Sequence, residues 1–227
     1  MKNEINITRP FGPTLLQVEL PKNIIDDLNK DCEEISAGKH KKVDWAPHLA
    51  GRVQEEYLMS DPVLAKHINF FIHMAGRYAF PDEAAFDKAI KDHEIAFQSG
   101  WYVRQNTNDF NSTHHHTNCN ISCVGYLKLP EDIEEHWAEE QKDHNPSAGA
   151  IEFSYGVSGF NCPNILKYKP EVGKFFMFPH FLDHRVYPFK SKYPYPDPKG
   201  ERRSFSINII ITKNDHQADL DARKNKK

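Results

Sequence analysis

The sequence predicts an α+β fold, in which N-terminal helices pack on one sheet of a β-sandwich or barrel formed by the rest of the chain. Up to about residue 93, apolar residues recur at helical spacing. From about residue 94, short runs of β-branched and aromatic residues alternate with Gly, Pro and Asn turns. The 227 residues contain no Pro/Gly/Ser-rich linker, so we expect a single domain, 1–227. Its parts are a helical third (about 1–93), a β core (about 94–212) and a charged tail (213–227).

Helices are expected at three places in the N-terminal third, after an irregular lead-in with a short strand. The first begins at Pro21 and ends at Gly38, with apolar residues near a 3.6-residue period. Asp61 is the expected N-cap of the second, because a first-position proline follows it. The third follows Pro81. Residues 39–58 are mixed in character, and Trp45 and Pro47 mark a loop there.

Seven runs of roughly mean strand length are expected in the β core. Two segments, 131–144 and 187–201, are interpreted as surface excursions, and the first is acidic and helical in character. The expected strands are 95–97, 101–103, 121–129, 150–155, 165–168, 174–178 and 204–212.

A run of three histidines, His114 to His116, precedes the apolar segment that ends near Leu127. We interpret the run as the start of a strand, where alternate side chains point to opposite faces. His114 and His116 then share a face and His115 does not. Two imidazoles in this arrangement can bind one metal ion, and a third ligand must come from elsewhere. His184, at a strand edge after an apolar strand and a proline turn, is the best candidate.

A polar stripe is expected on the last strand. Arg202, Ser204, Ser206 and Asn208 line one face, and the residues between them line the other. A guanidinium binds a carboxylate through two parallel hydrogen bonds, and a hydroxyl two residues on can add another. The stripe therefore indicates a carboxylate site, although alone such a stripe is more often the wet face of a sheet.

The order of these motifs resembles the iron(II)- and 2-oxoglutarate-dependent oxygenases, in particular a small branch common among marine phages and bacteria. The motifs are His-x-His, then Phe-Pro-x4-His-x-Val-x-Pro, then Arg-x-Ser-x-Ser-x-Asn, within about residues 94–212. A weaker likeness covers residues 11–13 and 48–51. The resemblance implies a double-stranded β-helix, or jelly roll, with helices against one sheet.

The resemblance also implies a function and its residues. His114, His116 and His184 correspond to the metal ligands, and Arg202 with Ser204 corresponds to the clamp for the distal carboxylate of 2-oxoglutarate. We expect Fe(II), 2-oxoglutarate and O₂ to be required, and a substrate to be hydroxylated with release of succinate and CO₂. Further candidates for the cosubstrate pocket are Tyr102, Tyr126 and Asn208.

One position departs from the pattern of most of the superfamily, which has Asp or Glu where this chain has His116. A site of three histidines carries one negative charge less, which changes iron binding and oxidation potential. Asp109, Asp183 or a water could complete the coordination instead. Two other functions stay open: a cupin-like three-histidine oxygenase that needs no cosubstrate, and a non-catalytic metal- or ligand-binding jelly roll.

Composition limits which partners and which cellular location we expect for this protein. A net charge of −3 gives no basic field for duplex nucleic acid, and no apolar run is long enough to span a membrane. The charged start lacks the apolar core of a signal peptide, and the four cysteines form no CxxC pair or dense framework, so we expect a cytoplasmic protein, in the host if phage-encoded. The sequence does not identify the substrate, which is a small molecule or a peptide. A homodimer formed through the helical third is a further possibility.

Overall fold

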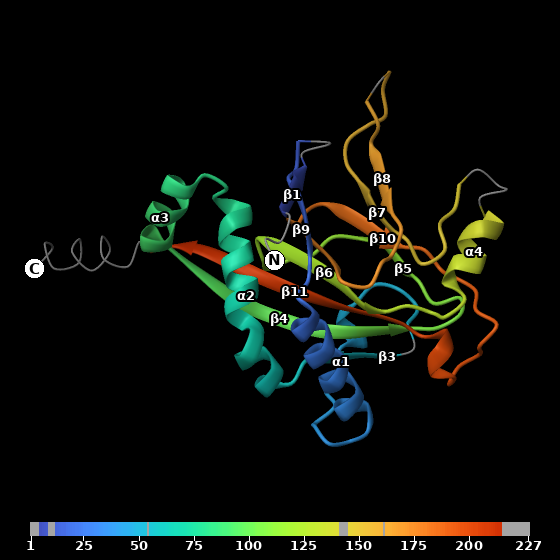
Figure 1. Cartoon of the computed structure of the whole chain (residues 1–227). Helices are drawn as coiled ribbons and strands as arrows, with labels where there is room; N and C mark the ends of the chain where they lie inside the picture. The colour runs from blue at the N-terminus through green and yellow to red at the C-terminus, as the bar shows by residue number, and fades with distance from the viewer. Residues whose placement is uncertain (1–4, 9–11, 54, 141–144, 161, 215–227) are drawn as a thin grey trace, which may run out of the picture.

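A computed structural model describes residues 5–8, 12–53, 55–140, 145–160 and 162–214 (Figure 1). Most of the predicted tail, from residue 215, and part of the first predicted excursion, 141–144, lie outside the described residues. The elements in chain order are β1 (Ile5–Thr8), β2 (Leu15–Glu19), α1 (Lys22–Ser36), η1 (Ala46–His48), β3 (Glu55–Leu58), α2 (Asp61–Ala79), α3 (Glu83–Asp92), β4 (His93–Gln105), β5 (Asn111–His114), β6 (Ile121–Lys128), α4 (Ile133–Glu140), β7 (Ile151–Ser154), β8 (Ile165–Tyr168), β9 (Lys174–Pro179), β10 (Asp183–Val186), η3 (Pro198–Gly200) and β11 (Arg202–Lys213).

Two antiparallel sheets form the body of the molecule. The larger has seven strands in the order β1-β2-β9-β6-β11-β4-β3, and the smaller has four in the order β5-β10-β7-β8. In Figure 1, α1 and α2 lie across one face of the large sheet, and the small sheet includes the projecting β7–β8 hairpin. The predicted class, helices packed on one sheet of a two-sheet β structure, is therefore confirmed.

Strand β9 shows how the large sheet separates two apolar cores. Phe175 and Met177 pack with the helices, whereas Phe176 and Phe178 pack with Ile151 and other residues of the small sheet. Because strand side chains alternate between faces, four consecutive apolar residues contribute to both layers. Each such side chain is fully buried, and burying a Phe contributes about 1.5–3 kcal/mol.

The helices cover the outer face of the large sheet through the apolar stripes expected from the sequence. On α1 the stripe is Ile24, Leu28, Cys32 and Ile35, spaced by three and four residues and all buried. On α2, Phe71 packs against two rings of the sheet, Phe175 and Phe205, with centroid distances of 5.7 and 5.8 Å. This leaves the opposite face of the large sheet, toward the small sheet, for the polar stripe of β11.

Four expectations about the elements need correction. Residues 95–97 and 101–103 belong to one strand, β4, because the polar stretch between them forms a bulge and not a turn: β11 skips Gln98 in its pairing. Ser60, not Asp61, is the N-cap of α2, and Asp61 is the acidic residue of its first turn. The mixed region 39–58, in which only a loop was predicted, also contains β3. The second excursion, 187–201, is only partly on the surface, since Phe189 is buried against Ile133.

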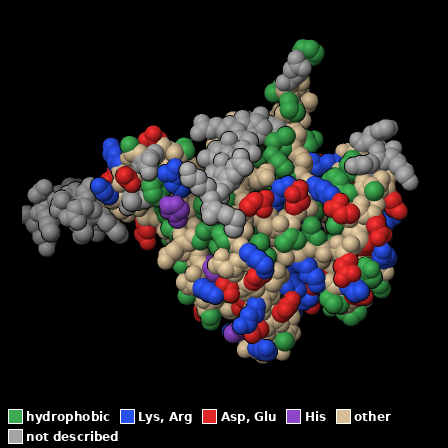
Figure 2. Space-filling view, viewed as in Figure 1, with side chains coloured by type: hydrophobic (Ala, Val, Ile, Leu, Met, Phe, Trp, Pro, Cys, Tyr) green, Lys and Arg blue, Asp and Glu red, His purple; other side chains and the backbone are tan. Residues whose placement is uncertain are grey.

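Charged side chains of both signs are interspersed over the face shown in Figure 2. Hydrophobic side chains gather on the β7–β8 hairpin, which projects from the body in this view. Its residues Tyr155, Val157, Phe160 and Ile165 make up half of the large exposed hydrophobics of the described chain. Among the described residues, no helix has the length and apolar character needed to cross a bilayer.

Candidate metal centre

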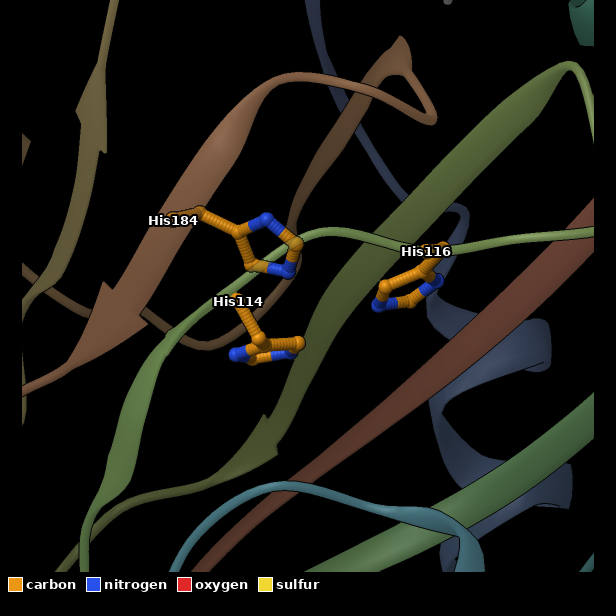
Figure 3. Close-up of side chains that lie close together, drawn as sticks. All are labelled: His114, His116 and His184. Atoms are coloured by element: carbon orange, nitrogen blue, oxygen red, sulfur yellow. The ribbon is translucent and has the colours of Figure 1, made fainter.

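The three histidines predicted as metal ligands converge at one place. His114 is the last residue of β5, and His184 lies directly opposite it on β10. His116 lies two residues beyond β5, and all three rings point toward one another (Figure 3). The potential ligand atoms, one from each residue, lie within 4.8 Å of one another. Side chains 70 residues apart in the sequence therefore form one compact group of nitrogen donors.

The local chain path differs from the expected one. The histidine run ends a strand of the small sheet instead of starting the strand that reaches Leu127. Between the two strands, Asn118 adopts a positive φ of 60°, a conformation that Asn tolerates better than most residues. The chain crosses from one sheet to the other there, so His116 reaches the cluster from the crossover and not from a regular strand.

Each ring nitrogen Nδ1 of the cluster faces an oxygen atom. For His114 the oxygen is the Ser112 carbonyl at 2.7 Å, and for His184 it is the Leu182 carbonyl at 2.9 Å. For His116 it is Oδ1 of Asn208 at 2.7 Å. A carbonyl oxygen only accepts, so each ring donates from Nδ1 and leaves the Nε2 lone pair for a metal. Such outer hydrogen bonds are typical of histidines that bind metals.

Burial keeps the three rings neutral. Loss of solvation lowers the pKa of His116 to about 4, against a weaker opposing effect of the Asn208 hydrogen bond. Burial also lowers the pKa of His114, and lowers that of His184 well below its usual value. A metal binds the neutral imidazole, so the cluster needs no proton removed at neutral pH.

The neighbouring acidic residues do not join the cluster. Among the described residues, the group able to hold a metal at this place consists of the three histidines. Asp183, one of the alternatives considered from the sequence, is half exposed and faces Nδ1 of His115 at 3.2 Å. Asp109 accepts a hydrogen bond from the Asn106 backbone. His115 itself is exposed and outside the cluster, as its position in the run predicts.

Arg202 lies inside the fold without a carboxylate partner. Its side chain is completely buried, and no ion pair of the described residues includes it. Nη1 donates to Gln105 and to the Ser204 hydroxyl, the latter at 3.2 Å. Nε and Nη2 have no hydrogen-bond partner in the described chain. Because a buried unpaired charge is strongly unfavourable, these two donors indicate a site for an anion.

The remaining predicted pocket residues fall in three different places. Tyr126 lies beside Arg202, whose guanidinium carbon is 5.0 Å from the ring centroid, and its buried hydroxyl also lacks a partner. Asn208 does not face the arginine: it orients His116 and accepts a hydrogen bond from Ser122. Tyr102 lies on the helix-covered face, where its hydroxyl donates to Asp31 at 2.8 Å. The expectation that Tyr102 lines the pocket is therefore wrong, because strand alternation turns it outward.

Two hollows meet at the histidines. The inner cavity has a volume of about 40 Å³ and extends from the three rings to Ser204 and Ser206. The outer groove has a volume of about 320 Å³ and shares His114, His116 and Trp101 with the cavity. The cluster therefore separates an interior space on the Arg202 side from a groove open to the outside.

Sequence reasoning missed several residues around these hollows. Trp101 and Glu56 line the inner cavity and Gln105 contacts Arg202, but no motif in the sequence marks any of the three. Gln105 at the end of β4 carries only the weak signal of a polar residue next to an apolar run. Glu56 carries none, because β3 itself was not predicted.

Two facing antiparallel sheets with a histidine cluster and a buried arginine define a jelly-roll protein whose histidines could hold a metal ion and whose arginine could bind an anion. Residues 99–208 match the model of the family described as "Putative 2OG-Fe(II) oxygenase", which includes every motif of the resemblance. The match covers the β core and confirms the resemblance. The predicted cofactors, Fe(II) with 2-oxoglutarate and O₂, are those of the family.

Solved structures with similar folds include prolyl hydroxylases from three sources. A Pseudomonas putida prolyl-4-hydroxylase has a TM-score of 0.52 at 12% identity, over 92% of this chain and 93% of that chain. The viral collagen prolyl hydroxylase of Paramecium Bursaria Chlorella virus-1, in complex with 2OG, has a TM-score of 0.50 at 14% identity, over 86% and 94%. A Trichoplax adhaerens prolyl hydroxylase with a hypoxia inducible factor peptide fragment has a TM-score of 0.51 at 13% identity, over 92% and 84%. These likenesses confirm the jelly-roll fold. Among the curated proteins, none matches the chain.

The residues present fit both groups that the family uses. Three neutral imidazoles with free Nε2 atoms suit Fe(II) and leave further coordination positions to cosubstrate and O₂. The two unpaired nitrogens of Arg202, with the Tyr126 hydroxyl beside them, suit one carboxylate. The fit therefore rests on donors that the fold leaves unused.

Proposed function

We propose that this protein is an Fe(II)- and 2-oxoglutarate-dependent dioxygenase that hydroxylates a substrate and releases succinate and CO₂. The observation that carries the proposal is the completely buried Arg202, with two unpaired nitrogens on the same strand face as the cavity. A structural arginine needs its charge paired where it is buried, whereas an arginine that binds an anion must keep donors free.

The side chains of the site have different roles. His114, His116 and His184 hold the metal, which, when bound with 2-oxoglutarate and O₂, supplies the oxidising chemistry. Arg202 binds the distal carboxylate and Ser204 supports it, while Gln105 fixes the guanidinium through Nη1. Apolar residues such as Phe178 and Val124 line the cavity and exclude water around the reacting groups.

A cosubstrate-free three-histidine oxygenase is the second candidate, because His116 stands where a carboxylate is common in the superfamily. That function gives Arg202 no anion to bind. Replacing Arg202 with Ala therefore separates the two: activity that depends on 2-oxoglutarate is lost, whereas cosubstrate-free activity is retained.

The test starts with metal-free protein, Fe(II) and 2-oxoglutarate under anaerobic conditions. We expect a weak visible charge-transfer band that saturates with 2-oxoglutarate, and succinate formation when O₂ is admitted. His184→Ala should abolish both. His115→Ala is the matched control, since His115 is exposed, belongs to the same histidine run and lies outside the cluster. Full activity in His184→Ala, or no band with iron bound, contradicts the proposal.

Three further points stay predictions. Hydroxylation as the outcome needs an identified substrate. The cytoplasmic location and the homodimer through the helical third need measurements of their own, fractionation of the source cells and sedimentation of the purified chain.

A further inference from the structure

Glu56 is a buried carboxyl group that the proposed chemistry does not use. It lies on β3 opposite Val103 of β4, and it is 5% exposed. Its side chain lines the inner cavity together with His114 and Trp101. Its neighbour Glu55 points to the other face and pairs with Arg104 at 2.8 Å and with Lys42 at 3.1 Å. Both glutamates line an outer hollow with Lys42 and Asp44, but only Glu55 is ion-paired.

The charge of Glu56 has no counterpart in the described chain. Its Oε1 lacks a hydrogen-bond partner, and the ion pairs formed by β3 involve Glu55 and not Glu56. The charged groups that face it are Asp44 and Asp109, both acidic, and its hydrogen-bonding neighbour is the Asn111 amide. Burial, and to a lesser degree these two acids, raise the pKa of Glu56 to about 7, while Asn111 opposes the increase. A cationic group beside Oε1 would provide the missing hydrogen-bond donor and neutralise the carboxylate.

The route from the outside to Glu56 is walled by aromatic rings. Trp101 borders both the groove and the cavity, and its ring lies 5.7 Å from that of His116. Trp45 lies 6.5 Å from Trp101 and 4.4 Å from His48, also in the groove. The faces of tryptophan rings attract cations. Within the groove and cavity, a positive ligand therefore meets indole faces first and a carboxylate at the inner end.

We propose that Glu56 recognises a cationic nitrogen of the prime substrate, so that the substrate is a small amine or guanidine compound. This proposal rests on the proposed function and adds the substrate class to it. The groove volume of about 320 Å³ is at the lower end of small-molecule sites, roughly 300–1,000 Å³, which favours a molecule of amino-acid size. Glu56 is thus a specificity-determining residue that lines the inner cavity beside His114.

Binding of matched probes tests the proposal without any turnover. The full-length protein, metal-free and again with Zn²⁺, is titrated with L-arginine, L-lysine, agmatine and putrescine, and with the neutral analogues L-citrulline and L-norleucine. Quenching of tryptophan fluorescence reports binding near Trp101, and calorimetry confirms it. We expect at least one cationic probe to bind, and its neutral analogue to bind at least roughly 10-fold more weakly, the usual range for a hydrogen bond to a charged group.

Two variants complete the test. Glu56→Gln keeps the shape of the side chain and removes its charge. We expect it to lower the affinity for the cationic probe by roughly 10- to 100-fold. Glu55→Gln is the matched control, and we expect unchanged binding. The proposal is overturned if no cationic probe binds, if neutral analogues bind equally well, or if Glu56→Gln binds like the wild type. Because succinate formation is not the readout, these outcomes are independent of the test of Fe(II) and 2-oxoglutarate chemistry.

Discussion

Two arginines next to each other on β11 meet opposite environments. Arg203 faces the helices, where it pairs with Glu201 at 2.8 Å, approaches Glu33 at 3.3 Å and donates to Asn29. Arg202 faces the small sheet, where it contacts Gln105 and Ser204 and has no carboxylate partner in the described chain. Both are almost completely buried, so exposure does not distinguish them. What differs is whether the fold itself neutralises the charge.

The difference separates a structural from a binding role. On the helix face, Glu201 also accepts from Arg104 at 2.8 Å, and these hydrogen bonds lower its pKa to about 2 although burial opposes this. That network is complete without a ligand. On the other face, two donors of Arg202 are left free for a ligand. Without a ligand, the unpaired buried charge of Arg202 destabilises the fold. Changes to the two faces should therefore affect different properties.

Removing Glu201 should have the largest effect, and it should fall on stability. Glu201→Ala leaves Arg104 and Arg203 without their shared partner, and breaking a buried pair costs about 3–5 kcal/mol. Urea unfolding of wild type and variant measures the loss. The control is Glu171→Ala, an exposed partner of Lys174 that should change the free energy of unfolding by less than about 1 kcal/mol. Equal effects of the two changes contradict a structural network on the helix face.

Replacing Arg202 should affect ligand affinity with little or no loss of stability. Arg202→Met removes an unpaired charge while keeping most of the volume, which is often neutral or stabilising. The same change removes hydrogen bonds to the distal carboxylate worth about 1.5–3 kcal/mol, so the Kd for 2-oxoglutarate should rise roughly 10- to 100-fold. Anaerobic titration measures it, with Arg77→Met on α2 as the control. A variant that unfolds easily yet binds 2-oxoglutarate normally contradicts the comparison.

The pH dependence of the metal-free protein should separate the two regions. The pKa of His116 is about 4 in the folded state and about 6.5 in the unfolded state. Between these values the unfolded chain binds more protons, so the free energy of unfolding should fall by about 1–3 kcal/mol as pH decreases from 6.5 to 4. Glu201, with its lowered pKa, should lose its contribution only below about 4.5, as pH falls toward 2. Urea unfolding with chelator present measures this, and His116→Gln should flatten the upper part of the profile.

Gln105→Glu should have the smallest effect and make Arg202 resemble Arg203. Gln105 already accepts a hydrogen bond from Nη1, so a carboxylate there would pair the guanidinium internally. We expect affinity for 2-oxoglutarate to fall by about 5- to 10-fold, the equivalent of about 1–1.4 kcal/mol. The new carboxylate would repel the anionic ligand and neutralise the Arg202 guanidinium that binds it. The titration used for Arg202→Met measures it. Unchanged affinity would show that pairing of Arg202 does not control binding.

The parts of the site found from the sequence are those that follow from strand alternation and motif spacing. Arg202 and Ser204 share the inner face of β11 because they are two residues apart, and the same reasoning places Phe205 outside. Tyr102 was not placed by this reasoning, and its pairing with Phe205 puts it on the outer face with that residue. Which strands pair is decided by long-range contacts that have no fixed sequence sign.

The sequence by itself determined the residue types and their local order: two histidines two residues apart, a third far downstream, and an arginine followed by two serines on one strand face. Only the tertiary structure decided that these groups meet, since the pairing of β5 with β10 brings His184 to His114 across 70 residues. It also decided which charges are paired. Glu33 reaches Arg203 through long-range packing of α1, whereas no side chain of opposite charge in the described fold pairs with Arg202 or Glu56. Local spacing can place a side chain on a face, but partners distant in the sequence are fixed only when the layers pack.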